Sequence, residues 1–404
     1  MPTEKLYWDD PFALTFEAKD AAVAVFDARP SLVLPATRFY PEAGGQLGDT
    51  GTLEVGGMAL DVVDTQVTED GVIHHILAEP PPPEGLEGPV RGNVHRDRRL
   101  DHMAHHTAQH MLSSALVDAA RAETVSARLG RASCTIDLDV PGIADRALAA
   151  AEDRVNAVIR DDVTVRAFFP TEAELANLKL RRAPKVAEGI RVIDIDGFDQ
   201  SPCGGTHCTR TGQLGLVRVA GVEKYQGKVR LSFHAAARAL ADARAKDAVL
   251  AAITAELTCG APDASAALAK LKADLRASRD ALGLTRAELA MRVADEALAA
   301  HPPSPGGGDT RIVVTRERDD TPTLRVLAGR LASRDDVVGV CLSPDGEPGE
   351  FAVVVQRGAA SRFDCGAWLK RVASEHGGRG GGRPERAEGR LSAKAALAVP
   401  TSEP

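Results

Sequence analysis

Two pairs of metal-binding side chains stand out in this sequence. His106 and His110 occur in H-T-A-Q-H, and Cys203 and His207 occur in C-G-G-T-H, with three residues between the partners of each pair. On an α-helix four residues turn through about 400°, so His106 and His110 would lie about 40° apart on one face. The two glycines of the second pair allow a tight backbone turn that brings Cys203 and His207 together. Nitrogen and sulfur ligands suit Zn²⁺, so the spacing predicts a zinc site formed by all four side chains.

A zinc ion with four protein ligands can be structural or catalytic. Structural sites are usually closed, whereas catalytic sites keep a position for water. The sequence has no C-x₂-C pair, and a single cysteine beside a glycine turn favours a catalytic pocket. Thr107 follows His106 where the H-E-x-x-H proteases have a glutamate, so activation of water would fall mainly to the metal. Both interpretations remain open at this stage.

Other histidines and cysteines compete for the same role. His102 lies one helical turn before His106, and His105 is its direct neighbour; positions that support the ligands or face solvent are more usual for such residues. His74 and His75 fall in an apparent strand and are interpreted as structural. The remaining cysteines lack ligand spacing: Cys134, Cys208, Cys259, Cys341 and Cys365.

Composition limits the class of protein. The chain has 404 residues, of which 44% are hydrophobic and 26% charged, enough for two to four domains. No apolar run reaches membrane-spanning length, and no signal peptide is visible, so a cytoplasmic protein without a membrane partner is expected. The net charge of −8 argues mildly against nucleic-acid binding, but residues 361–404 hold eight Lys/Arg and five Asp/Glu, a local charge of 8 − 5 = +3.

The elements that must position the four ligands can be read from the periodicity. Residues 12–78 alternate in short apolar runs that predict a small sheet or barrel, of which we expect a small β-barrel, interrupted by a glycine-rich loop over 37–51. A helix then carries the two histidines, an alanine-rich helix covers 144–159, and strands flank the C-G-G-T-H turn. This order predicts an α+β fold.

The rest of the chain divides into a helical part and a second mixed part. Leucines at three-, four- and seven-residue steps predict a coiled-coil-like seam over 235–300, with a break at 259–263 that suggests a helical hairpin. Such a seam packs helices or subunits together, so a homodimer is a candidate state. After a linker at 302–308, strands alternate with helices in an α/β pattern. A glycine-arginine run follows, which either cradles phosphate or forms a simple loop.

Together these motifs resemble a known family. H-T-A-Q-H, C-G-G-T-H and T-R-F-Y-P-E-A-G-G-Q-L-G-D-T-G are similar to the editing region of alanyl-tRNA synthetases and to free-standing AlaX-type editing proteins, and G-G-R-G-G-G-R-P-E-R-A resembles the DHHA1 domain. Too few residues precede the barrel for an aminoacylation domain. The resemblance therefore implies a long AlaX-type protein with a barrel over 1–90, a zinc-binding editing domain over 91–235, a helical hairpin over 236–301 and a DHHA1-like tRNA-binding domain over 309–404.

The resemblance also implies roles for single residues. The four zinc ligands match the family in type and spacing. Ala43 departs from the family, which often has glycine or serine there. The implied substrate contacts are Thr37, Gly44, Gly45, Gln46 and Gln109, of which Thr37 is implicated in recognising a serine hydroxyl. The implied tRNA contacts are Arg379, Gly380, Gly381, Gly382 and Arg383.

The implied activity is zinc-dependent hydrolysis of mischarged Ser-tRNA(Ala), with Gly-tRNA(Ala) as a further candidate and Ala-tRNA(Ala) spared. It answers a physical need, because an apolar pocket for alanine rejects serine by only about 10²-fold. Two alternatives are a non-catalytic tRNA-binding protein with a structural zinc and a zinc hydrolase of a small ester or amide.

Overall fold

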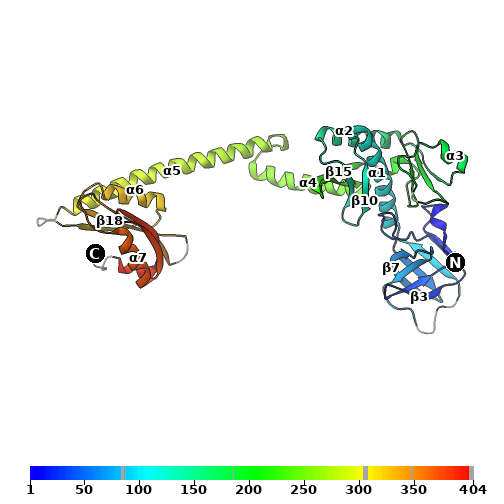
Figure 1. Ribbon diagram of the computed structural model, residues 1–404, viewed down its shortest axis with the longest axis horizontal. Coiled ribbons are helices and arrows are strands. Elements are labelled where there is room, and N and C mark those ends of the chain that lie inside the picture. The colour runs from blue at the N-terminus through cyan, green and yellow to red at the C-terminus, as the bar shows by residue number, and fades with distance from the viewer. Residues whose placement is uncertain (83–85, 87, 185, 304–307, 347–348, 400–404) are drawn as a thin grey trace. The chain divides into compact units, whose positions relative to one another are not determined.

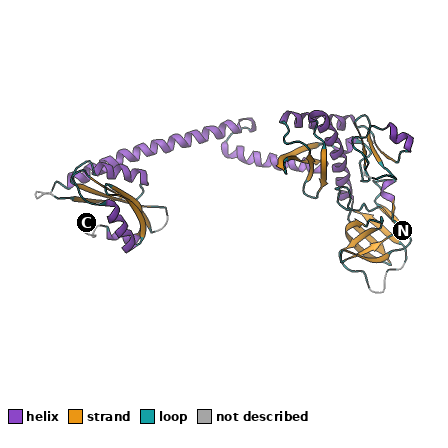
Figure 2. Ribbon diagram, in the orientation of Figure 1, coloured by secondary structure: helices purple, strands orange, loops and turns teal. Residues whose placement is uncertain are grey.

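The computed structural model describes residues 1–82, 86, 88–184, 186–303, 308–346 and 349–399. It contains two compact units, Met1–Ala252 and Ile253–Pro404, which are described separately (Figure 1). The four predicted domains are a finer division, and their boundaries stay predictions. Part of the predicted linker, residues 304–307, and the last five residues of the predicted fourth domain lie outside the described residues. Both units mix helices and strands, so the predicted α+β class is confirmed (Figure 2).

The first unit begins with a seven-stranded antiparallel sheet. Its order is β2-β9-β6-β7-β8-β4-β3. The strands are β2 (Thr15–Ala18), β9 (Val90–Val94), β6 (Gly51–Val55), β7 (Met58–Val67), β8 (Ile73–Leu77), β4 (Arg29–Val33) and β3 (Ala22–Phe26). A closed barrel would require hydrogen bonds between β2 and β3. Within the described residues none joins these two strands, so the predicted barrel is corrected to an open sheet.

A long buried helix forms the centre of the first unit. Helix α1 (Arg96–Ala120) carries H-T-A-Q-H, and every residue from His102 to Leu116 is buried. It packs against α2 (Asp145–Asp161), the alanine-rich helix predicted at 144–159. Because a fully buried helix leaves its polar side chains without water, those side chains need partners inside the protein.

Two smaller sheets complete the surroundings of α1. Four strands pair in the order β10-β11-β16-β15: β10 (Thr124–Leu129), β11 (Cys134–Leu138), β16 (Lys228–Ala235) and β15 (Val217–Tyr225). Three strands pair in the order β12-β13-β14: β12 (Val165–Phe168), β13 (Val192–Ile195) and β14 (Asp199–Pro202). The C-G-G-T-H turn directly follows β14, so this hairpin delivers the second ligand pair to α1. The N-terminal β1 (Glu4–Lys5) pairs in parallel with β5 (Ala36–Thr37).

The second unit contains a five-stranded sheet in the order β17-β18-β19-β21-β20. The strands are β17 (Thr310–Thr315), β18 (Val337–Pro344), β19 (Glu350–Arg357), β21 (Arg386–Ser392) and β20 (Gly378–Arg383). Helix α6 (Thr321–Leu331) and the end of α5 (Ala264–Ala300) share one hydrophobic core with the sheet. Helices α7 (Cys365–His376) and α8 (Ala393–Ala398) share another. Residues of β18 contribute alternately to both cores, which confirms the predicted α/β pattern.

The predicted helical break at 259–263 is confirmed. Helix α4 (Ala236–Leu257) ends before it, and α5 begins after a short 3-10 turn at Ala261–Asp263. The leucines of the predicted seam are about half exposed along α5: Leu268, Leu271, Leu275, Leu282 and Leu289. Across the described chain, no helix has the length and apolar character needed to cross a membrane.

Candidate metal centre

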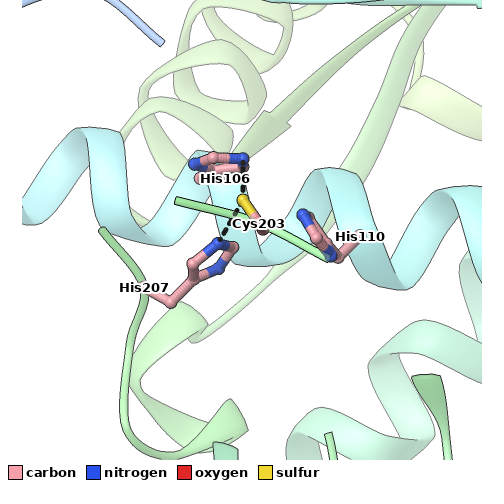
Figure 3. Close-up of side chains that lie close together, drawn as sticks. All are labelled: His106, His110, Cys203 and His207. Carbon is pink, nitrogen blue, oxygen red and sulfur yellow. Dashed lines mark hydrogen bonds between the residues drawn. The ribbon is translucent and has the colours of Figure 1, made fainter. Parts of the chain in front are cut away.

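The structure brings the four predicted ligands together. The candidate ligand atoms of His106, His110, Cys203 and His207 all lie within 4.8 Å of one another (Figure 3). The Sγ atom of Cys203 lies 3.4 Å from Nε2 of His106 and 3.3 Å from Nε2 of His207. Two ligands come from one face of α1 and two from the turn after β14. Residues about ninety positions apart in the sequence therefore form one compact donor set.

Neighbouring side chains fix which nitrogen each histidine can offer. Nδ1 of His106 lies 2.8 Å from Oε1 of Gln46, an oxygen that can only accept, so Nδ1 carries the proton and Nε2 is free. The hydroxyl of Thr107 donates to the Met103 carbonyl at 2.9 Å, so Nδ1 of His207 must donate to that hydroxyl across 3.2 Å. Both histidines therefore present an unprotonated Nε2, as a metal ligand must.

The third histidine points to the same conclusion by a different observation. Within the described residues, neither ring nitrogen of the fully buried His110 has a hydrogen-bond partner. Its Nδ1 lies 3.4 Å from Oδ2 of Asp199. The other oxygen of Asp199 accepts from Nε of Arg181 at 2.7 Å, and Ser201 donates to Oδ2 at 2.9 Å. A metal ion would satisfy the unpaired Nε2, and Asp199 is placed to support the ring from behind.

The electrostatic surroundings suit a thiolate ligand. Burial alone would raise the pKa of the Cys203 thiol, but the adjacent His106 and His207 hold that pKa well below its usual range. Burial and the neighbouring His106 keep the pKa of His207 well below its ordinary value. A thiolate beside unprotonated imidazoles is the state that Zn²⁺ requires, so the residues present fit this metal.

A pocket of about 740 Å³ opens beside the cluster and is lined by His106 and Cys203. Gln109, Gly44 and Gly45 also line it, as expected for substrate contacts. The Gln109 amide donates to Oγ of Ser113 at 2.8 Å, and that oxygen also accepts from Thr124 at 2.6 Å. The predicted substrate contacts of Gln109, Gly44 and Gly45 stay predictions.

The glycine-rich loop approaches β10 closely. Gly45 has a φ of +87°, and a Cβ there would lie 2.3 Å from the carbonyl oxygen of Ala127. Its own carbonyl accepts from the Leu129 amide at 2.7 Å. Glycine is therefore required for the backbone contact that forms this wall of the pocket. Gln46 instead turns inward, where its amide also donates to Thr206 at 2.8 Å, and is not among the lining residues.

The structure places Thr37 outside the pocket lining. Its side chain is fully buried, with Oγ1 2.8 Å from Nε2 of His75, and it accepts from the Phe39 amide at 3.1 Å. Nδ1 of His75 lies 2.9 Å from the Leu32 carbonyl, so Nδ1 carries the proton and the Thr37 hydroxyl donates to Nε2. Burial lowers the pKa of His75 to about 4, which keeps the ring neutral. The predicted role of Thr37 in serine recognition stays a prediction.

The competing histidines and cysteines remain outside the donor cluster. His105 accepts from the Ala235 amide at 3.1 Å and contacts Asp101, a structural role. His102 is buried beside a different cavity. His74 lies 3.0 Å from the Ser31 hydroxyl. Cys208 is buried, and burial raises its pKa to about 12.

Several residues around the site were not identified from the sequence. Asp199 and Thr107 support two of the ligands, and Arg191 donates to the carbonyls of Cys203 and Gly205 at 3.1 and 2.8 Å. The indole of Trp8 donates to the Gly204 carbonyl at 2.8 Å. Thr107 and Asp199 lie close to the ligands in sequence, which was a usable signal. Trp8 lies almost two hundred residues away, and nothing in the sequence connects it to this turn.

The glycine-arginine run is a strand. Residues Gly378–Arg383 form β20, an exposed edge strand that pairs with β21 and lies against α7. A Cβ at Gly380 would lie 2.8 Å from Leu369, and one at Gly382 would lie 2.3 Å from the Arg386 carbonyl. The interpretation as a simple loop is therefore wrong: Gly380 permits close packing of β20 on α7, and Gly382 permits a close approach of β20 to β21. The predicted tRNA contacts of Arg379 to Arg383 stay predictions.

Comparisons with known proteins agree with these features. Residues 12–81 match tRNA synthetases class II (A), residues 190–232 match the threonyl and alanyl tRNA synthetase second additional domain, and residues 309–399 match the DHHA1 domain. The alanyl-tRNA editing protein Aarsd1 of Rattus norvegicus is 29% identical over 89% of this chain and 84% of its own length.

Matches to synthetases cover less. The alanine–tRNA ligases of Thermofilum pendens and Sulfurisphaera tokodaii are each 36% identical over 59% and 57% of this chain, which spans only about a quarter of their length (27% and 26%). The C-Ala domain structure from Aquifex aeolicus alanyl-tRNA synthetase covers 24% of this chain and 88% of its own at 25% identity, with a TM-score of 0.22, too low to support a fold assignment. The resemblance read from the motifs is confirmed: the chain is a relative of the alanyl-tRNA editing proteins that joins an editing-type region to a DHHA1 domain.

Proposed function

We propose that this chain is a zinc-dependent deacylase that hydrolyses Ser-tRNA(Ala) and spares Ala-tRNA(Ala), with Gly-tRNA(Ala) as a further candidate substrate. The observation that carries the proposal is the position of the donor cluster. His106 and Cys203 line a pocket of about 740 Å³, whereas a purely structural zinc needs no pocket. The similarity to an alanyl-tRNA editing protein supports the same activity.

The chemistry divides between the metal and the protein. When bound, zinc would polarise the ester carbonyl and lower the pKa of a water molecule. Gln46, Thr107 and Asp199 hold the three imidazoles in fixed orientations, so the donor set is preorganised before substrate arrives. The Gly44–Gly45 backbone and Gln109 supply the polar wall against which the aminoacyl group would lie.

Selection of serine over alanine requires a polar group that alanine leaves unpaired. The predicted substrate contacts Gln109 and Thr37 differ in whether they line the pocket. Gln109 lines the pocket, whereas the Thr37 hydroxyl already donates to His75 and accepts from Phe39. The geometry therefore favours Gln109 as the polar contact in this pocket.

The deciding experiment compares Ser-tRNA(Ala) with Ala-tRNA(Ala) as substrates of the zinc-loaded full chain. Release of serine with sparing of alanine, abolished by chelation and restored by Zn²⁺, is the expected result. Binding of both tRNAs without release of either amino acid would instead identify a non-catalytic binder with a structural zinc. A serine ester lacking tRNA, hydrolysed as fast as the charged tRNA, would identify a small-molecule hydrolase.

The second unit is proposed to contribute tRNA affinity. Arg379 and Arg383 lie on the exposed edge strand β20. Replacing both with glutamine should weaken tRNA binding and reduce the slope of log Kd against log salt by about 2, one for each lost phosphate contact. An unchanged slope would exclude this strand as a tRNA contact.

A further inference from the structure

A second cavity continues past the metal pocket on the first unit. It has a volume of about 510 Å³ and shares Lys5, Trp8 and Arg191 with the metal pocket. Its far part is lined by Phe169, which lies just after β12. The two cavities therefore adjoin, with Lys5, Trp8 and Arg191 common to their walls. We call these two adjoining cavities the Trp8 groove.

The groove holds two cations without acidic partners. Lys5 is half-buried, its Nζ lies 4.4 Å from the centre of the Trp8 ring, and burial lowers its pKa. Arg191 is only 6% exposed and donates to backbone carbonyls. Within the described chain neither residue forms an ion pair with a carboxylate, although Glu4, Asp9 and Glu188 also line the groove. The Cys203 thiolate supplies a negative charge near Arg191, whereas desolvation is what acts on Lys5. A cation removed from water without a counter-charge is costly, so an anionic ligand would complete the environment of Lys5.

The groove also exposes an aromatic surface. The Phe169 side chain is 51% exposed, and its ring meets Trp8 edge to face, with centroids 5.4 Å apart. In this geometry Trp8 can cover at most one face of the Phe169 ring, so the other face is available for stacking. Exposed aromatic rings beside cations bind single-stranded nucleic acid, because bases stack on the rings while phosphates meet the cations.

We propose that the Trp8 groove binds the single-stranded 3′ end of the tRNA, with Lys5 at a phosphate and a base stacked on Phe169. This inference rests on the proposed function, because the ester to be cleaved is attached to the terminal ribose of that strand. Because the groove adjoins the metal pocket, the orientation of the RNA strand in it can be assigned. The terminal nucleotide lies at the junction beside Trp8, and the preceding nucleotides run toward Phe169.

The test measures binding without turnover. The probes are a fluorescent stem-loop RNA ending in a single-stranded ACCA and the same RNA without its last three nucleotides, each titrated with the zinc-loaded full chain. Native protein should bind the intact probe about 10-fold more tightly than the shortened one. Lys5→Met and Phe169→Leu should each remove most of that difference, and Lys5→Met should reduce the salt slope by about 0.7.

Matched variants separate charge and stacking from folding. Lys5→Arg should keep the preference for the intact probe, and Glu4→Gln should keep or increase it. Zinc content and thermal unfolding of each variant should match the native chain. Equal binding of the two probes by native protein, or native-like binding by both Lys5→Met and Phe169→Leu, would overturn the groove. If the groove passes this test while Ser-tRNA(Ala) is not hydrolysed, the proposed activity fails and the binding surface stands.

Discussion

The two units of this chain bury different kinds of residue. The interior of the first unit contains histidines, Gln46, Asp199 and the Asp49–Arg99 ion pair. In the described part of the second unit the buried polar residues are only hydroxyls: Thr323, Ser343 and Ser361. Buried charged and imidazole groups are costly unless they are paired. The first unit thus buries the polar and charged groups that surround the candidate metal centre. The core of the second unit is mostly apolar.

The contrast predicts where a cysteine matters. Cys203→Ala should remove a zinc ligand and lower both zinc content and deacylation, with a rate loss of about 100-fold or more. Cys365→Ala, in the buried core of the second unit, should leave zinc content unchanged and affect only stability. Zinc content by atomic spectroscopy and Ser-tRNA(Ala) deacylation would be measured for both variants. Full zinc occupancy in Cys203→Ala would break the contrast and the assigned donor set.

A smaller effect on zinc binding is expected for Asp199, which lies beside the ligand His110. Asp199→Asn should weaken zinc binding by about 10- to 100-fold, because His110 loses its carboxylate support and Arg181 loses its partner. Asp319→Asn removes a comparable carboxylate paired with Arg316 in the second unit and should leave zinc affinity unchanged. Competition with a chromogenic chelator measures both. Equal zinc affinity in Asp199→Asn and the native chain would show that this carboxylate is not coupled to the metal.

Thr37 offers a sharper test within the first unit. Thr37→Val leaves the buried His75 ring without its donor and should destabilise the chain by about 1–3 kcal/mol. If its role is structural, the preference for Ser-tRNA(Ala) over Ala-tRNA(Ala) survives, while Gln109→Leu reduces it. Unfolding in urea and the two deacylation rates separate these outcomes. A lost preference with native stability in Thr37→Val would instead support serine recognition by Thr37.

The smallest effect on folding is expected on α5. Leu271 and Leu275 are about half exposed, so replacing both with glutamate should change the free energy of unfolding by less than about 0.5 kcal/mol per site. If the leucine seam joins two copies of the chain, the same variant should sediment as a monomer while the native chain sediments as a dimer. Sedimentation velocity of both proteins decides this, and a native monomer would remove the proposed homodimer.

Local patterns in the sequence predicted much of this molecule. The i, i+4 histidines required a helix to converge, and α1 has that form. The two glycines between Cys203 and His207 predicted a tight turn that brings these side chains together, and the structure has this turn. The leucine steps, the break before α5 and the alternation of strands and helices after residue 309 were likewise local signals of period and turn chemistry. The cluster of four candidate metal ligands, the α+β class and the family resemblance followed from the sequence alone.

Only the tertiary structure decided what surrounds those ligands. The predicted substrate contact of Gln46 stays a prediction. The structure adds that its amide oxygen orients His106, because the glycine-rich loop folds inward against β10 and α1. The glycine-arginine run is a strand, because hydrogen bonds to β21 outweigh the flexibility of its glycines. Contacts between distant segments decided three further features. The first sheet stays open, the Trp8 indole donates to the Gly204 carbonyl, and Asp199 lies beside His110. Side-chain periodicity indicates which face of a helix or strand is buried, but it does not indicate which distant residue packs against that face.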